Sequence, residues 1–402
     1  MPVTPLEATL SLALTAAFDG NFPDCLGVAV SGGGDSMALL DMLRRWDQVP
    51  LAVVSVNHGL RDGAAGELAL VSDYAAQHGL SHDILNWQWD GSGNLQKAAR
   101  EGRRSMIAQW AKARNIAHVA LGHTKDDQAE TFLMRLARGS GVEGLACMAG
   151  VREDDDVFWV RPLLNVGRDE LRAYLRAHGL TWADDPSNED TRFDRVKARQ
   201  MMATLAPLGI TVDRLAQTAA HMRREREVAT WATNTAAQNC VTLDAGDVMI
   251  SRDRAVNVPE AVLLRIVADG LSQVSGAVYR PRFRALQAAI VASQPVSLHG
   301  CLILPSQSSW RITREWAAIQ TLRSSVYDVW DKRWRLIPPA GTEVSNLEVA
   351  ALGELGIAQL DSWRSAARPR QSILSSPAVW QGDTVIAAPL AGAKNGWEAI
   401  LA

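Results

Sequence analysis

The sequence predicts an α/β protein built on a doubly wound parallel sheet, followed by a mixed, mainly helical second domain and a small β-containing C-terminal domain. Two observations predict the sheet. Between residues 26 and 122, short apolar runs alternate with helix-like stretches, which is the rhythm of consecutive βαβ units. Three of these runs also end in polar or glycine-rich segments. In such sheets the loops after the strands form the ligand-binding edge, so we expect the functional residues there.

The elements follow in a regular order. Apolar runs predict strands at 28–30, 51–57, 83–87 and 117–122, with helix-like stretches between them at 37–46, 66–78 and 94–114. The first run is too short for a confident helix and is rich in small and β-branched residues, which favours a buried strand. Parallel pairing of these strands would bring the loops at Ser31, Asn57 and His123 to one edge of the sheet.

The rest of the chain changes in character. Helical spacing dominates from Thr211 to about Ala237 and returns at Pro259–Ser293, before strand-like runs at 296–304 and 310–312. Beyond Asp331, glycine, proline and short apolar runs indicate a small β-containing module. The expected domains are therefore residues 1–205, 206–325 and 326–402.

Composition restricts the class of protein. The 402 residues are 47% hydrophobic and 21% charged, as in soluble globular proteins. No apolar run reaches the ~18 residues of a membrane helix, so we expect a cytoplasmic protein with no membrane contact. The four cysteines lie far apart without a Cys-x-x-Cys pair, which disfavours a zinc ribbon or a disulfide framework. The net charge of −3 disfavours an indiscriminate nucleic-acid binder but leaves a selective one open.

The segment Ser31-Gly32-Gly33-Gly34-Asp35-Ser36 follows the first strand. Three glycines let backbone N–H groups close on an anion, and the helix that follows favours negative charge at its start. A Walker A loop is excluded because no lysine follows Gly34, and a dinucleotide fingerprint would need glycine where Met37 stands. An ordinary glycine-rich turn is the alternative. The segment resembles the signature of PP-loop ATP pyrophosphatases, which cleave ATP between its α and β phosphates.

Carboxylates gather after the fourth strand. Asp126 and Glu130 are four residues apart and Asp127 and Glu130 three apart, so they share a helix face. They could simply complement the helix dipole. Near a pyrophosphate loop, they are instead candidate catalytic residues together with Asp35, and Asp35 and Asp127 are candidate ligands of Mg²⁺, which prefers oxygen donors.

Polar residues at the other strand ends are candidate nucleotide contacts. Asn57 and His58 follow the second strand, His123 follows the fourth, and Arg100 belongs to a basic helical stripe. Each also has a structural interpretation, as a hydrogen-bonded loop residue or a solvated helix face. Beyond them, Arg138 follows the carboxylate helix, and a polar loop at 184–195 leads into a basic helix start. Arginines with one aromatic ring suit a reader of nucleic-acid loops, whereas local salt bridges are the alternative.

Together these segments resemble the tRNA(Ile)-lysidine synthases, a family of PP-loop enzymes. The resemblance covers most of residues 26–199, in the family's order, and extends to 298–301 and 311–315 in the second domain, whereas the third domain matches weakly. It implies an adenine nucleotide alpha-hydrolase-like fold and ATP-dependent ligation of lysine to C2 of the wobble cytidine of tRNA(Ile). The O2 atom is first adenylated, and pyrophosphate and AMP are released. The implied cofactors are ATP and Mg²⁺, and the partners are tRNA(Ile) with a CAU anticodon and free L-lysine.

The resemblance also implies roles for residues. Lysine must lose a proton before it attacks, and Glu130 or Asp127 could accept it. The residues expected to contact tRNA are Arg138, Asn188, Arg192, Arg195, Lys197 and Arg199. Wider recognition of the tRNA would fall to residues beyond about 210, and a homodimer is compatible with the sequence.

Three alternatives stay open. A PP-loop tRNA 2-thiolation enzyme would adenylate the same kind of carbonyl, but it commonly needs a cysteine pair. A small-molecule amide-forming PP-loop synthetase leaves the 185–199 segment and the two C-terminal domains unexplained. A non-enzymatic nucleotide-binding module would give the carboxylates no task.

Overall fold

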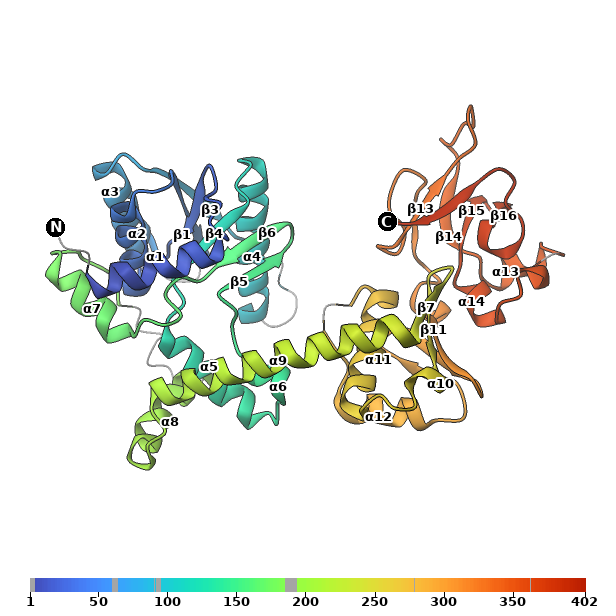
Figure 1. Cartoon of the computed structure of the whole chain (residues 1–402). Helices are drawn as coiled ribbons and strands as arrows, with labels where there is room; N and C mark the ends of the chain where they lie inside the picture. The colour runs from blue at the N-terminus through green and yellow to red at the C-terminus, as the bar shows by residue number, and fades with distance from the viewer. Residues whose placement is uncertain are drawn as a thin grey trace. The chain divides into compact units, whose positions relative to one another are not determined.

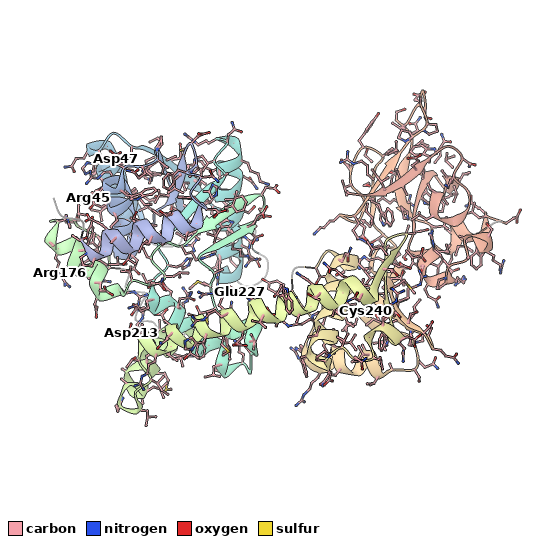
Figure 2. The ribbon with its side chains drawn as sticks, in the orientation of Figure 1. Arg45, Asp47, Arg176, Asp213, Glu227 and Cys240 are labelled. Atoms are coloured by element: carbon pink, nitrogen blue, oxygen red, sulfur yellow. The ribbon has the colours of Figure 1, made fainter. Side chains whose placement is uncertain are left out.

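The structure is a computed structural model that describes residues 4–59, 64–89, 91, 95–184, 194–277, 279–361 and 363–402. The chain forms two compact units, Met1–Glu227 and Val228–Ala402. Helix α9 (Val212–Cys240) crosses the boundary between them, as the labels on Asp213, Glu227 and Cys240 show (Figure 2). No helix in the described ranges is long and apolar enough to span a membrane.

The first unit contains a six-stranded sheet with the order β3-β2-β1-β4-β6-β5 (Figure 1). The strands are β1 Leu26–Ala29, β2 Leu51–Asn57, β3 Ser81–Asn86, β4 His118–Leu121, β5 Val151–Asp154 and β6 Val157–Val160. Five strands run parallel, and only β5 pairs antiparallel, with β6. The predicted doubly wound parallel sheet is confirmed.

Helices cover both faces of this sheet, because alternate strand residues point to opposite sides. The helices of the first unit are α1 Pro5–Ala17, α2 Gly34–Trp46, α3 Ala64–Gln77, α4 Leu95–Ala113, α5 Lys125–Ala137, α6 Val142–Leu145, α7 Arg168–Ala177 and α8 Asp194–Leu205. Val53 packs in a core with α1, α2, α3 and α7, whereas its neighbours Ala52 and Val54 pack with α4. The loops after β1 and β4 leave adjacent strands at the point where the strand order reverses, which is where such sheets bind ligands.

A buried carboxylate joins three of these helices. Asp41 of α2 is fully buried and accepts hydrogen bonds from Tyr74 of α3 (2.5 Å) and Tyr174 of α7 (2.6 Å). Arg44 and Arg45 donate to the same carboxylate at 2.9 and 2.7 Å. Burial alone would raise the pKa of Asp41, but these four donors outweigh it and hold the pKa far below its usual value. Asp41 therefore fixes α2, which begins in the glycine loop, against α7.

The second unit combines two sheets and a strand pair. The first sheet has the antiparallel order β7-β8-β11-β10-β9 and packs against α11 (Glu260–Ser275) and α12 (Phe283–Val291). Its strands are β7 Val241–Asp244, β8 Asp247–Ser251, β9 Val296–Leu298, β10 Cys301–Pro305 and β11 Ser309–Arg314, with α10 at Arg252–Ala255. The helical run expected at 259–293 is thus divided into two helices, and the strand expected at 296–304 into β9 and β10.

The C-terminal part of this unit is mostly β. The second sheet has the order β12-β14-β15-β16, and β13 pairs with β17. These elements are β12 Arg323–Ser325, β13 Trp334–Ile337, β14 Glu348–Ala351, β15 Pro377–Gln381, β16 Thr384–Ala387 and β17 Glu398–Leu401, with α13 at Gly353–Ala358 and α14 at Arg370–Leu374. The expected helical and β-containing regions are present, and the three domain boundaries remain a prediction.

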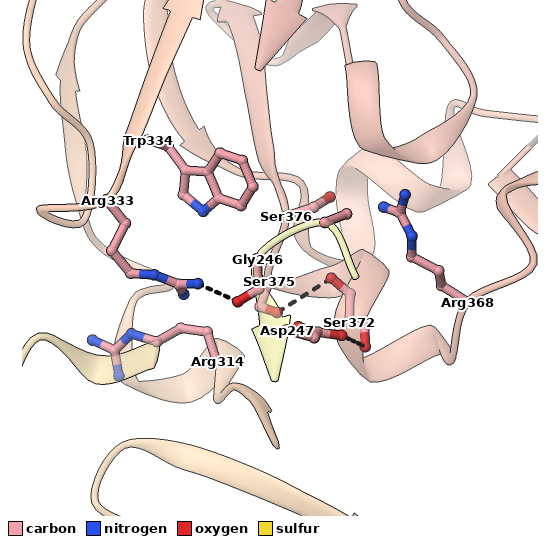
Figure 3. A pocket seen from close by; sticks show the side chains of 10 residues that line it. Gly246, Asp247, Arg314, Arg333, Trp334, Arg368, Ser372, Ser375 and Ser376 are labelled. Atoms are coloured by element: carbon pink, nitrogen blue, oxygen red, sulfur yellow. Dashed lines mark hydrogen bonds between the residues drawn. The ribbon is translucent and has the colours of Figure 1, made fainter. Parts of the chain in front are cut away.

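A polar seam joins the two parts of the second unit around a cavity of about 10 Å³, enough for one water molecule (Figure 3). Asp247 at the start of β8 is buried and accepts from Arg311 at 2.7 Å and from Ser372 of α14 at 2.6 Å. Arg333 donates to the carbonyl oxygens of Val274 and Gly246. The polar atoms of this seam satisfy one another, which indicates a structural role.

Candidate active site

The loop between β1 and α2 has the compact form that the glycines predicted. The Ser31 N–H donates to Ser36 Oγ (3.1 Å), and Ser36 Oγ donates to the Gly33 carbonyl (2.9 Å). Gly32 has φ +86°, and a Cβ there would lie 2.7 Å from the Glu67 carbonyl oxygen. Only glycine fits this position without strain.

The loop presents the start of α2 to the ligand edge of the sheet. Within the described part of the chain, no side chain caps α2 at Gly33, so the positive end of the helix dipole remains available to an anion. The loop after β4 lies directly against it, because a Cβ on Gly122 would come within 3.1 Å of the Asp35 backbone. The loops after β1 and β4 therefore form one edge.

We expect Gly32→Ala to destabilise the protein and to weaken ATP binding. The positive φ alone costs about 1–2 kcal/mol for a residue with a Cβ, and the contact with Glu67 adds to it. Gly33→Ala is the matched control, since its φ is ordinary and the nearest atom to its Cβ lies 3.6 Å away. Urea unfolding measures the difference in stability. Equal stability of the two variants would contradict the assigned strain.

The carboxylates after β4 lie at the start of α5. Asp127 forms a capping box with Thr124: its Oδ2 accepts from the Thr124 N–H (2.8 Å) and hydroxyl (3.0 Å). Its Oδ1 is left to face the site. Glu130, one turn further, is fully buried. Asp126 Oδ2 accepts the backbone N–H of Arg168 at 2.8 Å and so holds the start of α7.

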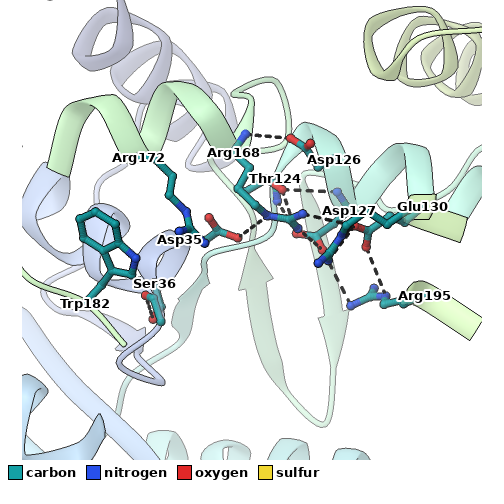
Figure 4. Close-up of polar contacts among 12 residues, drawn as sticks. Asp35, Ser36, Thr124, Asp126, Asp127, Glu130, Arg168, Arg172, Trp182 and Arg195 are labelled. Atoms are coloured by element: carbon teal, nitrogen blue, oxygen red, sulfur yellow. Dashed lines mark hydrogen bonds and ion pairs between the residues drawn. The ribbon is translucent and has the colours of Figure 1, made fainter. Parts of the chain in front are cut away.

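Arg168 lies at the centre of these carboxylates (Figure 4). Its guanidinium forms ion pairs with Asp35 (3.2 Å), Asp127 (3.4 Å) and Glu130 (3.3 Å). The four predicted catalytic carboxylates are thus brought together by a residue that the sequence reasoning missed. A signal was present, because a cation at the first position of a helix is unfavourable to the helix dipole and needs compensation.

The pKa values follow from this crowding. Burial raises the pKa of Asp35 above its ordinary value, although Arg168 opposes the shift. Burial would also raise the pKa of Asp127, but Arg195 and Arg168 outweigh it and lower that pKa. Burial would lower the pKa of Arg168, yet the surrounding carboxylates, Asp127 foremost, raise it. Arg168 and the carboxylates around it therefore act on one another electrostatically.

Two basic residues of α8 point into the same cluster. Arg199 contacts Glu130 Oε1 at 3.0 Å, and Arg195 lies 3.8 Å from Asp127 and 4.0 Å from Glu130. The sequence predicted both as tRNA contacts, and the structure places them beside the carboxylates. Within the described residues, Asp35 Oδ1 and Glu130 Oε2 are buried without a hydrogen-bond partner. These oxygens remain available to a ligand.

The predicted nucleotide contacts lie at the same edge of the sheet. Asn57 bonds Asn86 (3.1 Å) and the Gly59 N–H (3.0 Å), and His58 packs edge-on against Trp87. Burial lowers the pKa of His123 to about 4, so its imidazole is neutral near pH 7. These positions fit a nucleotide site.

Arginines from several elements surround His123. The electrostatic neighbours that lower its pKa, after burial, are Arg161, Arg195 and Arg103. Arg100, the predicted ATP contact, in turn acts on Arg103 and Arg161. Arg103 was not among the predicted residues, because the sequence alone does not distinguish it from the other basic residues of α4. A group of arginines that act on one another electrostatically suits a polyanionic ligand.

Comparison with known proteins decides the family. The PP-loop domain profile matches residues 7–205. A tRNA(Ile)-lysidine synthase of Ruegeria pomeroyi is 46% identical over 395 residues, covering 96% of this chain and 94% of that protein. The chain belongs to the tRNA(Ile)-lysidine synthase family. A tRNA(Ile)-lysidine synthase of Wolbachia pipientis wMel is 34% identical over 77% of this chain and 76% of its own. Among solved structures, a U34-tRNA thiolase from Methanococcus maripaludis gives a TM-score of 0.46 at 17% identity, covering 55% and 77% of the two chains.

Membership in the tRNA(Ile)-lysidine synthase family makes the chain an enzyme of the PP-loop ATP pyrophosphatase class, in agreement with the sequence-based prediction. Of the other predicted tRNA contacts, Arg138 is the C-cap of α5 and Lys197 lies on α8. Arg138 and Lys197 flank a groove of about 450 Å³ lined by Leu136 and Met201, and both approach Asp194. The predicted contacts Asn188 and Arg192 lie outside the described residues.

Proposed function

We propose that the chain joins L-lysine to C2 of the wobble cytidine of tRNA(Ile) and consumes ATP in doing so. One observation supports the assignment of this chemistry to the site: the carboxylate and arginine cluster lies directly beside a glycine loop at the ligand edge of the sheet. A nucleotide on the loop would place its phosphates next to Asp35, the second residue of α2. The acceptor base and lysine would then meet at the carboxylates.

The first step is adenylation. The cytosine O2 attacks the α-phosphate, the bond to the β-phosphate breaks, and pyrophosphate leaves with the electron pair. Loop amides and the start of α2 would hold the phosphates, and arginines near His123 would stabilise the charge that develops. Of the predicted nucleotide contacts, Ser31 and Ser36 would add their hydroxyl groups, and Asn57, His58 and Arg100 would line the adenosine side.

Mg²⁺ fits the residues that are present. Asp35 and Asp127 would hold it, since Asp35 Oδ1 is buried without a hydrogen-bond partner and Asp127 Oδ1 faces the site. In the described residues, no group of three or more His, Cys, Asp and Glu side chains is arranged to hold a metal alone. Proteins usually bind Mg²⁺ with one or two carboxylates, and phosphates and water complete its coordination. When bound, it would neutralise charge on the leaving pyrophosphate.

The second step is attack by lysine. Its ε-amine displaces AMP from C2, but the amine is protonated at neutral pH, because a lysine side chain in water has a pKa of ~10.4. Glu130 and Asp127 are the proposed acceptors of that proton. Glu130 offers Oε2, which has no hydrogen-bond partner among the described residues, whereas Asp127 offers Oδ1 only when that atom does not hold Mg²⁺.

The deciding experiment supplies purified protein with ATP, labelled lysine and a tRNA(Ile) transcript bearing C or U at the wobble position. Lysine should enter only the C-bearing transcript, with one AMP and one pyrophosphate released per lysine. ATP turnover without lysine transfer would contradict the proposal. Sulfur transfer is disfavoured by the four cysteines, which are all unpaired, three of them buried.

Cytoplasmic location and a homodimer stay predictions of this proposal. Sedimentation of the purified protein with and without tRNA would measure the oligomeric state, and cell fractionation would measure the location.

The second unit offers a surface for the tRNA. Tyr279 and Phe283 are large aromatic residues that are 77% and 58% exposed. Arg280, Arg282 and Arg284 alternate with them and are exposed as well, and Arg280 pairs with Asp269. Exposed rings between arginines suit unpaired or terminal nucleotides, where rings stack on bases and guanidinium groups hold phosphates.

We expect the double variant Arg282→Gln/Arg284→Gln to weaken tRNA binding about tenfold at 0.1 M salt and to reduce the salt dependence of binding by up to about two phosphate contacts. The KM for ATP should not change, because the variant leaves the first unit untouched. Arg335→Gln, an exposed arginine of β13, is the matched control. Filter binding across a salt series measures both quantities. If the slope of log binding constant against log salt concentration did not change, this surface would not contact the tRNA.

A further inference from the structure

We propose that Arg168 is an internal counter-cation: in the ligand-free enzyme its guanidinium stands where the cation of the ligand will bind, and it moves to the nucleotide when that cation arrives. This inference rests on the proposed function of the site. It makes Arg168 a positioning residue that keeps the carboxylates in place before the metal and lysine bind.

Arg168 divides its side-chain contacts among three carboxylates and forms no two-bond pair with any one of them. Each of its three nitrogen atoms faces a different carboxylate, at 3.2 Å to Asp35, 3.4 Å to Asp127 and 3.3 Å to Glu130. Charge-assisted hydrogen bonds usually measure about 2.7–2.9 Å, and arginine usually grips one carboxylate with two parallel bonds. A guanidinium spread among three acceptors at longer distances fills a central position without forming one strong pair.

The backbone of Arg168 is fixed, whereas its side chain extends into the site. Asp126 accepts the Arg168 N–H at 2.8 Å, and the Val166 carbonyl accepts the Lys125 N–H at 2.9 Å. These two hydrogen bonds hold the start of α7 against the start of α5. A guanidinium at the first position of a helix is repelled by the dipole and stays there because of the carboxylates. Once another cation neutralises these carboxylates, only side-chain rotation is needed for Arg168 to leave.

Charge balance gives the reason for the move. The cluster contains four carboxylates and four guanidinium groups: Asp35, Asp126, Asp127 and Glu130 with Arg168, Arg172, Arg195 and Arg199. A divalent metal or an ammonium group added to this balanced set would repel the arginines. The phosphates that arrive with the metal offer Arg168 a new partner, since guanidinium binds phosphate as well as carboxylate.

The test measures Mn²⁺ binding to the nucleotide-free protein, from the electron paramagnetic resonance signal of free Mn²⁺. Arg168→Gln should bind Mn²⁺ at least tenfold more tightly than the wild type, because the competing cation is gone. Arg168→Lys should fall between the two, since one ammonium cannot face three carboxylates. Arg176→Gln is the control: it removes the same charge from the exposed end of α7 (Figure 2) and should match the wild type.

A purely structural role of Arg168, in which it only stabilises the fold, predicts another result. Arg168→Gln would then lower the melting temperature and leave Mn²⁺ affinity unchanged, which would overturn the proposal. If Arg168→Gln does not fold by circular dichroism, Arg168→Lys decides: unchanged Mn²⁺ affinity in a folded Lys variant also overturns it. The measurement contains no ATP, lysine or tRNA. A failure of the proposed lysine transfer is therefore distinguishable from a failure of this inference.

Discussion

Asp35→Asn should abolish adenylation and leave the fold intact, with kcat for pyrophosphate release falling by at least about 10³-fold. Asparagine has the shape of aspartate but no charge, so it loses both the pairing with Arg168 and the capacity to hold a metal. The expected loss is large because Asp35 lies beside the glycine loop, where charge develops as pyrophosphate leaves. Pyrophosphate release with tRNA(Ile) and ATP measures the first step alone, without lysine.

Asp47→Asn is the matched control for this experiment. Asp47 is the exposed C-cap of the same helix α2, has a positive φ that asparagine tolerates, and lies at the end away from the glycine loop (Figure 2). It should retain wild-type rates. If Asp35→Asn kept more than a tenth of the wild-type rate, Asp35 would lose its place among the catalytic residues.

Asp41→Ala should be the most destabilising single change considered in the first unit, at about 3–5 kcal/mol of unfolding free energy. It leaves the hydroxyl groups of Tyr74 and Tyr174 and the donors of Arg44 and Arg45 without their shared acceptor. Urea unfolding at pH 7 measures the loss. A difference under 1 kcal/mol would show that the network adds little to stability.

The pH dependence provides a second check on Asp41. Its pKa in the folded protein is depressed, so its ionised form contributes stability that is fully present above the unfolded value of about 3.9. That contribution is lost as pH falls through the lower, folded pKa. The stability difference between wild type and Asp41→Ala should therefore stay constant from pH 7 to about pH 5 and shrink in more acidic solution.

The parts of the site whose residues are close together in the sequence could be predicted from the sequence. Ser31–Ser36 and the group from Asp126 to Glu130 each follow a strand directly, and the chemistry of each lies in local spacing. Arg168 could not be found in this way, because its partners Asp35 and Asp127 lie 133 and 41 residues away. Only the strand order brings them together.

The basic residues show a different limit. Arg195 and Arg199 have a charge that suits a phosphate, and sequence alone does not reveal that Glu130 is their partner. The bounds expected for the third strand, 83–87, differ from the observed ones because its burial pattern is unclear from sequence. The strand lies at 81–86 on the edge of the sheet, where exposed and half-buried residues do not give a clear apolar run.

The hydrogen bonds that Asp41 accepts from Tyr74 and Tyr174 have a consequence for genetic screens. Tyr74 and Tyr174 are separated from Asp41 by 33 and 133 residues, and neither lies in a loop after a strand. Substitutions there would loosen the helix that begins in the glycine loop without removing any reacting group. A screen for heat-sensitive alleles should therefore recover these tyrosines, whereas a screen for inactive enzyme at every temperature should recover Asp35 and its neighbours.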